Sequence, residues 1–266
     1  GSEGALGVCT RVRVRIHPVP QVVRHEAFRF PDFATGAAAL RAVEQQGTGP
    51  TVMRLSDETE TMVNLATATE SIGEQSGGAA SGGCLALCLF EGTADRAESR
   101  QAETRAVLLA NGGESLGAEP ARSWEHGRFG APVLRDSLLD NGALIETLET
   151  ATDWSGIPAL RDAVSAALTS SLEASGTPAL VMCHISHVYP TGASLYFTVV
   201  AGQRGEDPIE QWMDAKRAAS EAIVAAGGTI THHHAVGADH RPYLEREVGP
   251  VGMMMLRAVK MAVDPH

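Results

Sequence analysis

The stretch RQAETRAVLLANGGESLG, residues 100–117, follows the same plan as DAKRAASEAIVAAGGTITH, residues 214–232. In both, an alanine-rich segment with helical spacing ends at a Gly-Gly pair and leads into a short strand-like run. A repeated plan indicates that one supersecondary unit occurs twice in the chain. We therefore predict two related halves, each built from helices and strands around an antiparallel sheet.

The segments around these two stretches supply the other elements of each half. Strands are expected at 24–30, 50–57, 84–92, 143–154, 178–190 and 193–202, and helices at 34–47, 94–113, 156–176, 207–228 and 241–263. The segment 132–142 is ambiguous. This order predicts an α+β fold, an antiparallel sheet flanked by helices in two ferredoxin-like halves.

Two shorter segments complete the pattern. Residues 11–16 alternate arginine with valine or isoleucine, which predicts a half-buried strand that ends at Pro18. The segment TITHHHAVG, residues 229–237, is expected to be a short strand. On such a strand His232 and His234 share one face and His233 points the other way.

Composition limits the class of protein. The chain has 266 residues, is 44% hydrophobic and carries a formal charge of −11. It can bury a core, and its acidity argues against nucleic acid as a partner because phosphates require a basic surface. A phosphorylated small substrate needs only a few arginines. No apolar run is long enough to span a bilayer, so a cytoplasmic protein is expected. Cys84 and Cys88 are expected to be buried and reduced.

Tyr196 is a candidate acid–base group. In ASLYFTVV, residues 193–200, three apolar side chains share one face of the expected strand: Leu195, Phe197 and Val199. The phenol of Tyr196 can then point from the other face into a cleft. From the pattern alone, a structural tyrosine with a bonded hydroxyl is the favoured interpretation.

The three consecutive histidines allow three interpretations. His232 and His234 could bind a metal with His240 or an acid as a third ligand, although no HExxH or Cys/His spacing reinforces this. They could instead line an active site as polar and proton-transfer groups, or lie exposed on the surface. His187 is a lesser candidate.

Six motifs occur in a fixed order: GSEGALG (1–7), VMRLSD (52–57), VLRDSLLDNG (133–142), ETATDW (149–154), SHVYPTGASLYF (186–197) and GGTITHHHAVG (227–237). Together they resemble the alkyldihydroxyacetonephosphate synthases and their bacterial relatives, flavoproteins of the vanillyl-alcohol-oxidase superfamily. The resemblance runs nearly end to end. It implies that residues 1–20 are the end of an FAD-binding domain and residues 21–266 a substrate-binding cap domain. Ala235 departs from the family's usual HHHGVG.

The resemblance also implies a reaction and a cofactor. In this family a flavin mediates the exchange of an acyl for an alkyl group on acyl-dihydroxyacetone phosphate, a step of ether-lipid synthesis without net redox. FAD would be bound mainly by a larger N-terminal domain, with Gly1, Ser2, Gly4 and Gly7 contacting it from this chain. The chain alone is therefore expected to be inactive.

The same resemblance assigns the site residues. Tyr196 matches the family's catalytic tyrosine, and His232, His233 and His234 match histidines that line its active site. Arg135 and Arg54 match arginines that hold the substrate, which suits a guanidinium because it can bind a phosphate through two parallel hydrogen bonds. No metal is expected.

Two other functions stay open. One is an FAD-dependent oxidase or dehydrogenase of a 2-hydroxy acid, whose members carry a GEHGIG-type segment with metal-binding residues where this chain has THHHAVG. The other is a non-catalytic α+β binding module when the chain is isolated. The expected partner is a phosphorylated lipid or a hydroxy acid. Peripheral contact with a membrane and a homodimer also stay open.

Overall fold

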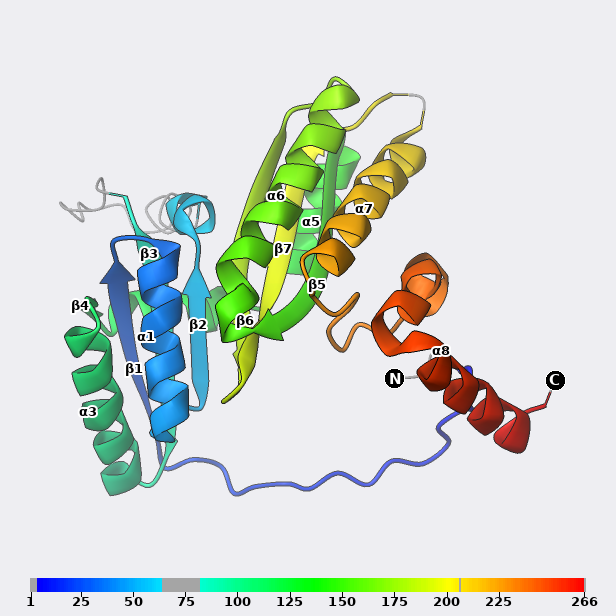
Figure 1. The fold of residues 1–266 in the computed structure, drawn as a ribbon. Helices are drawn as coiled ribbons and strands as arrows, with labels where there is room; N and C mark the ends of the chain where they lie inside the picture. The colour runs from blue at the N-terminus through cyan, green and yellow to red at the C-terminus, as the bar shows by residue number, and fades with distance from the viewer. Residues whose placement is uncertain (1–3, 64–81, 206, 266) are drawn as a thin grey trace.

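The computed structural model describes residues 4–63, 82–205 and 207–265, apart from the side chains of 131–134. Its centre is one seven-stranded sheet in the order β4-β1-β3-β2-β6-β7-β5, in which paired strands are antiparallel (Figure 1). The predicted α+β fold, an antiparallel sheet flanked by helices, is confirmed.

The first half of the sheet comes from the first part of the chain. Its elements are β1 (Val22–Phe30), α1 (Phe33–Gln46), β2 (Val52–Ser56), β3 (Cys84–Gly92), α3 (Ala94–Ala110) and β4 (Glu114–Gly117). Helix α1 begins after Asp32, which accepts a hydrogen bond from the amide of Thr35, and it ends at Gly47 with φ 74°. The spatial order β4-β1-β3-β2 with two helices is the ferredoxin-like arrangement.

The second half repeats this arrangement. Its elements are β5 (Ala143–Asp153), the short 3₁₀ helix η1 (Trp154–Gly156), α6 (Ile157–Ala174), β6 (Ala179–Val188), β7 (Gly192–Gly202) and α7 (Pro208–Ala225). The order β6-β7-β5 corresponds to β2-β3-β1. The halves meet where β2 pairs with β6 and Leu55 opposes Ile185. Two ferredoxin-like halves, as predicted, form one continuous sheet.

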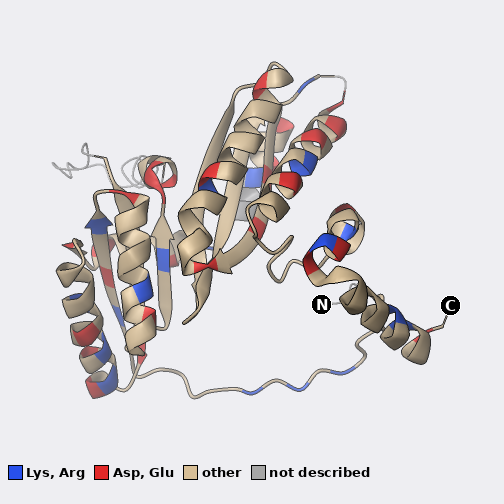
Figure 2. Ribbon diagram, in the orientation of Figure 1, with Lys and Arg blue, Asp and Glu red and all other residues tan. Residues whose placement is uncertain are grey.

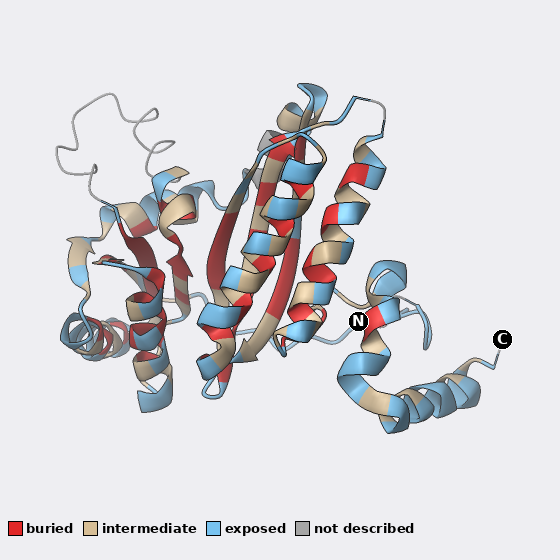
Figure 3. Ribbon diagram, turned by 45° about the horizontal axis from the view of Figure 1, so that its top comes forward, coloured by how far each residue is buried: buried red, intermediate tan, exposed pale blue. Residues whose placement is uncertain are grey.

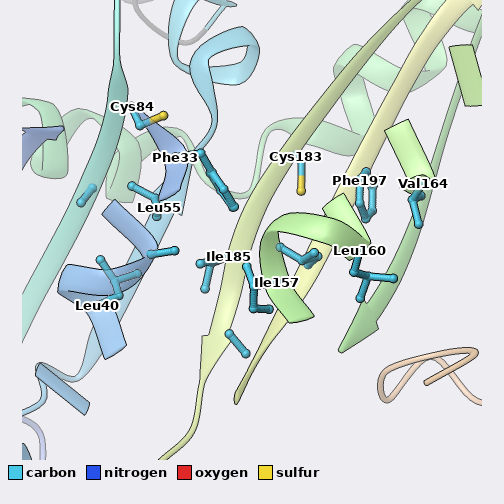
Figure 4. Packing of buried hydrophobic residues seen from close by; sticks show 14 of the residues in the cluster. Phe33, Leu40, Leu55, Cys84, Ile157, Leu160, Val164, Cys183, Ile185 and Phe197 are labelled. Carbon is cyan, nitrogen blue, oxygen red and sulfur yellow. The ribbon is translucent and has the colours of Figure 1, made fainter. Parts of the chain in front are cut away.

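The core lies on the face of the sheet that α1, α3, α6 and α7 cover (Figure 1). Figure 4 shows buried side chains from both halves in it, among them Phe33, Leu40, Leu55, Ile157, Leu160, Ile185 and Phe197. Cys84 and Cys88 are buried there with free thiols, as expected. One core therefore spans the junction of the halves.

The remaining helices lie outside this layer. Helix α4 (Glu119–Gly127) packs on the opposite face over β1 and β3, and α5 (Ala131–Asp140) contacts β5. Helix α8 (Gly237–Val263) contacts α7 and is kinked at Gly249, where φ is 71°. Its second part is largely exposed (Figure 3). Among the described residues, no helix is both long and apolar enough to cross a membrane.

The strand predicted at residues 11–16 is wrong for this structure. The segment is extended but has no partner strand among the described residues, and Val12, Val14 and Ile16 are 72, 71 and 85% exposed. Figure 2 shows its basic residues spaced along the open segment. Alternation produces a strand only where a neighbouring edge supplies hydrogen bonds, and no edge within residues 4–63, 82–205 and 207–265 does so for this segment. The ambiguous segment 132–142 is mostly helix, in α5.

Candidate active site

A row of polar side chains crosses the sheet on the face opposite α6 and α7. The strand register places Ser56 beside His184, His184 beside Tyr196, and Tyr196 beside Glu149. Because directly paired residues of neighbouring strands point to the same side, these four share one face, which we call the polar face. Neighbours of Tyr196 on β7 are fully buried in the core: Leu195, Phe197 and Val199. The predicted alternation around Tyr196 is confirmed.

The carboxylate of Glu149 lies at the centre of four histidines. Its side chain is 2% exposed. Its Oε1 lies 3.2 Å from His232 Nδ1 and 3.4 Å from His187 Nδ1. Its Oε2 lies 3.2 Å from His233 Nε2 and 3.1 Å from His234 Nε2. We call these five residues the Glu149 cluster.

The histidine run is not the strand that its sequence predicts. Its first residues follow the edge of β5, since Thr229 N donates to Ala151 O and His232 N donates to Glu149 O, at 2.9 and 3.0 Å. The backbone then turns, because His233 and Ala235 have φ of 41° and 67°. A left-handed residue breaks the alternation of a strand. All three rings therefore reach one carboxylate. The expectation that His233 points away from the face shared by His232 and His234 is wrong.

The electrostatics of the Glu149 cluster favour an ionised acid beside a neutral His232 ring. Burial alone would raise the pKa of Glu149, but hydrogen bonds from Ser186, at 2.5 Å, and from Ser194 hold that pKa below its usual range. Burial lowers the pKa of His232. At neutral pH the cluster thus holds a carboxylate that accepts hydrogen bonds and a His232 ring able to donate one.

A second buried acid lies on the other side of Tyr196. Glu60 accepts a hydrogen bond from Arg54 at 2.6 Å, and His184 Nδ1 lies 3.1 Å from both residues. Burial would raise the pKa of Glu60, but the charges of His184 and Arg54 lower it to about 2. Burial also lowers the pKa of His184, whose ring stacks on Tyr196 at 4.9 Å between centroids. His234 meets Tyr196 edge-on at 5.9 Å. Tyr196 thus lies between two histidines, each held by a different acid.

The other predicted residues lie in different surroundings. Arg135, on α5, is 48% exposed and pairs with Glu146 at 2.8 Å. His240 Nδ1 lies 3.3 Å from the carbonyl oxygen of Ala235 and belongs to the start of α8 rather than to the cluster. His187, a lesser candidate from the sequence, is part of the cluster. The structure thus brings Tyr196, Arg54, His187 and the histidine run to the polar face.

A pocket of about 310 Å³ opens beside the cluster. It lies between β5, the histidine segment and the start of α8, and its lining includes Glu149, His234 and Lys216. Lys216 donates to Asp239 in the same lining, at 2.7 Å. A small ligand in this pocket would touch the cluster directly.

Sequence reasoning missed Glu149, Glu60 and His184. Glu149 occurs in an expected strand, and the register of β5 against β7 is what places it beside Tyr196. His184 and Ser186 stand two residues apart on one expected strand, so the sequence places both on the same face. That spacing does not identify the acid that His184 contacts. These residues become visible once strands distant in sequence are paired.

The cluster also has the composition of a metal site. Ligand atoms of Glu149, His187, His232 and His233 lie within 4.8 Å of one another. Three imidazoles and a carboxylate suit zinc and similar ions. The same nitrogens, however, lie at hydrogen-bond distance from the carboxylate or its serine neighbours. The expectation of a metal-free site stays a prediction.

The described residues fit a flavin's reacting end better than its dinucleotide tail. Gly1 and Ser2 lie outside the described residues. Gly4 and Gly7 have φ of 82° and 155°, and a Cβ at either would meet no atom within 4 Å. These two glycines therefore form no enclosed cradle on this chain. Tyr196 and the histidines of the polar face do supply the donors and acceptors that a polar ring system requires.

Comparisons with known proteins agree with this architecture. Alkyldihydroxyacetonephosphate synthases of Caenorhabditis elegans and Trypanosoma brucei brucei are 32% and 30% identical to the chain over its full length. A crystal structure of an alkyldihydroxyacetonephosphate synthase matches 99% of the chain with a TM-score of 0.74 and 25% identity. The chain spans about half of these proteins, 47%, 46% and 46% respectively.

The resemblance expected from the ordered motifs is thereby confirmed. The family model that describes the C-terminal domain of FAD linked oxidases matches residues 19–266, nearly the whole chain. FAD is the cofactor that this family implies. The two ferredoxin-like halves, with a polar face built around Glu149 and Tyr196, belong to a protein of the FAD linked oxidase family, as its C-terminal domain.

Proposed function

We propose that this chain is the substrate domain of an alkyldihydroxyacetonephosphate synthase-like enzyme. The reaction exchanges the acyl group of acyl-dihydroxyacetone phosphate for the alkyl group of a fatty alcohol and releases a fatty acid. The observation that carries the proposal is the position of Tyr196 between His184 and His234 on the polar face. Bound FAD would supply the covalent chemistry at the exchanged carbon, and the chain's own residues would supply binding and proton transfer.

Tyr196 is the proposed proton-transfer group. Its ring packs against two imidazoles whose orientations are held by buried acids, so the phenol has a fixed direction. A positioned phenol can donate a proton to a leaving carboxylate and accept one from an entering alcohol. His232, His233 and His234 complete the polar wall and pass protons between Tyr196 and solvent.

The two arginines have different proposed tasks. Arg135 is half exposed, and its ion pair with Glu146 lies at the surface, where such a pair contributes little free energy. Its guanidinium can therefore exchange Glu146 for the substrate phosphate and bind it through two hydrogen bonds. Arg54 is 17% exposed and engaged by Glu60, so it supports negative charge on the substrate from within the sheet.

The test uses the protein that carries this chain together with an FAD-binding domain. It is incubated with acyl-dihydroxyacetone phosphate and a labelled fatty alcohol, and the labelled ether product and free fatty acid are measured. Equal amounts of both products, without consumption of an electron acceptor, are expected. Reduction of an acceptor by glycolate or D-lactate, with no ether product, would instead establish the 2-hydroxy-acid oxidase.

A further inference from the structure

The three consecutive histidines present different nitrogens to one carboxylate. His232 faces Glu149 with Nδ1, at 3.2 Å, whereas His233 and His234 face it with Nε2, at 3.2 and 3.1 Å. An ionised carboxylate accepts hydrogen bonds and donates none. His232 is hydrogen-bonded to Glu149 through Nδ1, so in its neutral form that nitrogen must carry the proton. The Nε2 atoms of His233 and His234 lie at ion-pair distance from the same carboxylate, and a proton on Nε2 is favoured there because a lone pair would face the negative charge. The left-handed backbone at His233 is what allows adjacent rings to turn opposite edges to the same acid.

The nitrogens on the other edges then carry lone pairs. His232 Nε2 lies 3.0 Å from the hydroxyl of Tyr189, which can donate to it. His233 and His234 approach Glu149 with Nε2, and the described part of the chain supplies no hydrogen-bond partner for Nδ1 of either ring. These two side chains are 56% and 37% exposed. Two accessible proton acceptors result, and His234 adjoins both Tyr196 and the pocket.

We propose that Glu149 is a positioning residue that fixes two different tautomers in one histidine run. It holds His232 protonated on Nδ1 and holds His233 and His234 protonated on Nε2, so that the last two present Nδ1 as a base and His234 does so beside Tyr196. This assignment rests on the proposed function for its purpose, which is to receive from Tyr196 the proton that the phenol takes from the entering alcohol. The serines that bond the carboxylate keep it in place, as Ser186 donates to it at 2.5 Å.

The tautomers can be read directly in this chain. The chain is labelled with ¹⁵N-histidine, treated with a chelator, and studied at pH 8.5 by long-range proton–nitrogen correlation, which distinguishes a protonated from an unprotonated ring nitrogen. Single His→Gln variants assign the signals. We expect His232 as the Nδ1–H tautomer and His233 and His234 as Nε2–H tautomers. One common tautomer for all three would overturn the proposal.

The variant Glu149→Gln tests the cause. The amide keeps the shape but replaces one accepting oxygen by an NH₂ donor, so at least one histidine must reverse its tautomer or lose its hydrogen bond. Glu146→Gln, three residues earlier on β5, is the matched control and should leave the three patterns unchanged. Unchanged tautomers in Glu149→Gln would contradict the proposal. If that variant does not fold, the tautomers measured in the wild-type chain still confirm or overturn the proposal.

The same variant separates this inference from the proposed function. In the FAD-containing protein, Glu149→Gln should lower the rate of acyl-for-alkyl exchange about 100-fold or more. A wild-type protein without exchange activity would remove the proposed function, and the nitrogen spectra would still confirm or overturn the tautomers. If the spectra show the expected tautomers but Glu149→Gln exchanges at the wild-type rate, the positioning role is overturned.

Discussion

Glu60 shows how one buried acid can stabilise the polar face. Its folded-state pKa of about 2 lies below the ordinary 4.5, so its contribution is present above pH 4.5 and is lost as the pH falls toward 2. The difference corresponds to about 3 kcal/mol. Glu60→Gln should therefore lower the free energy of unfolding by about 3 kcal/mol at pH 7 and by progressively less between pH 4.5 and 2.

Urea unfolding of wild type and variant across this pH range measures the difference. Asp57 acts in the opposite direction, because burial raises its pKa to about 6 and its ionisation between pH 4 and 6 costs stability. Burial is the main cause and is common to both proteins, so most of this effect cancels, and only the part that the charge of Glu60 contributes differs. Glu221→Gln removes an exposed pair with Arg246 and should change stability by less than about 1 kcal/mol. A constant difference at all pH values would argue against an ionised Glu60.

At the scale of elements, the histidine segment illustrates what a sequence pattern conceals. Residues 229–232 occupy the position that β4 holds in the first half, so the Gly-Gly repeat predicted their place correctly. The pattern did not predict a left-handed backbone at His233 and Ala235, because side chains other than glycine avoid it. The hydrogen bond of His232 to Glu149 and the close contacts of His233 and His234 with the same carboxylate offset that cost.

Ala235→Gly should stabilise the chain by about 1 kcal/mol, because glycine adopts φ near 67° without the clash of a Cβ. Gly227→Ala is the control of opposite sign. Gly227 has φ 76° and open space around it, so alanine there should cost about 1 kcal/mol through backbone strain alone. Thermal unfolding of both variants provides the measurement. A destabilised Ala235→Gly would mean that the segment does not hold this conformation.

The Glu149 cluster should hold no stoichiometric metal. The nitrogens of His187, His232 and His233 that face Glu149 already lie within 3.4 Å of its carboxylate, and no HExxH or Cys/His spacing supports a dedicated site. Elemental analysis after dialysis should find well under one zinc or iron per chain. One tightly held ion per chain, lost in His232→Ala, would contradict this and would favour the 2-hydroxy-acid oxidase.

At the scale of the whole molecule, the chain should not retain FAD by itself. Gly4 and Gly7 are exposed, and no atom of the described residues lies close enough to either to form a cradle, so these two positions offer the cofactor no enclosed surface. The purified chain is therefore expected to be colourless after gel filtration with FAD, as absorbance at the flavin bands would show. Stoichiometric absorbance that stays with the protein would refute this account of how FAD is held.

The fold was more accessible from the sequence than the site. Period-two alternation placed Tyr196 opposite Leu195 and Phe197, and the Gly-Gly repeat revealed the two halves, because both signals are local. The acids that organise the site are not local. Glu149 lies 83 residues from His232 along the chain, and Glu60 lies 124 residues from His184. The prediction of a strand at 11–16 was wrong for the same reason, because the residues of a segment do not determine whether another strand lies beside it.

The exchange rate of Tyr196→Phe in the FAD-containing protein tests the central claim most directly. The change keeps the ring and its packing between His184 and His234 and deletes the hydroxyl. Incorporation of labelled fatty alcohol should fall about 100- to 10,000-fold, with FAD content unchanged. Tyr243→Phe, in α8 and outside the lining of the pocket beside the Glu149 cluster, should retain the wild-type rate. Near-normal incorporation by Tyr196→Phe, with its flavin in place, would show that Tyr196 does not transfer the proton.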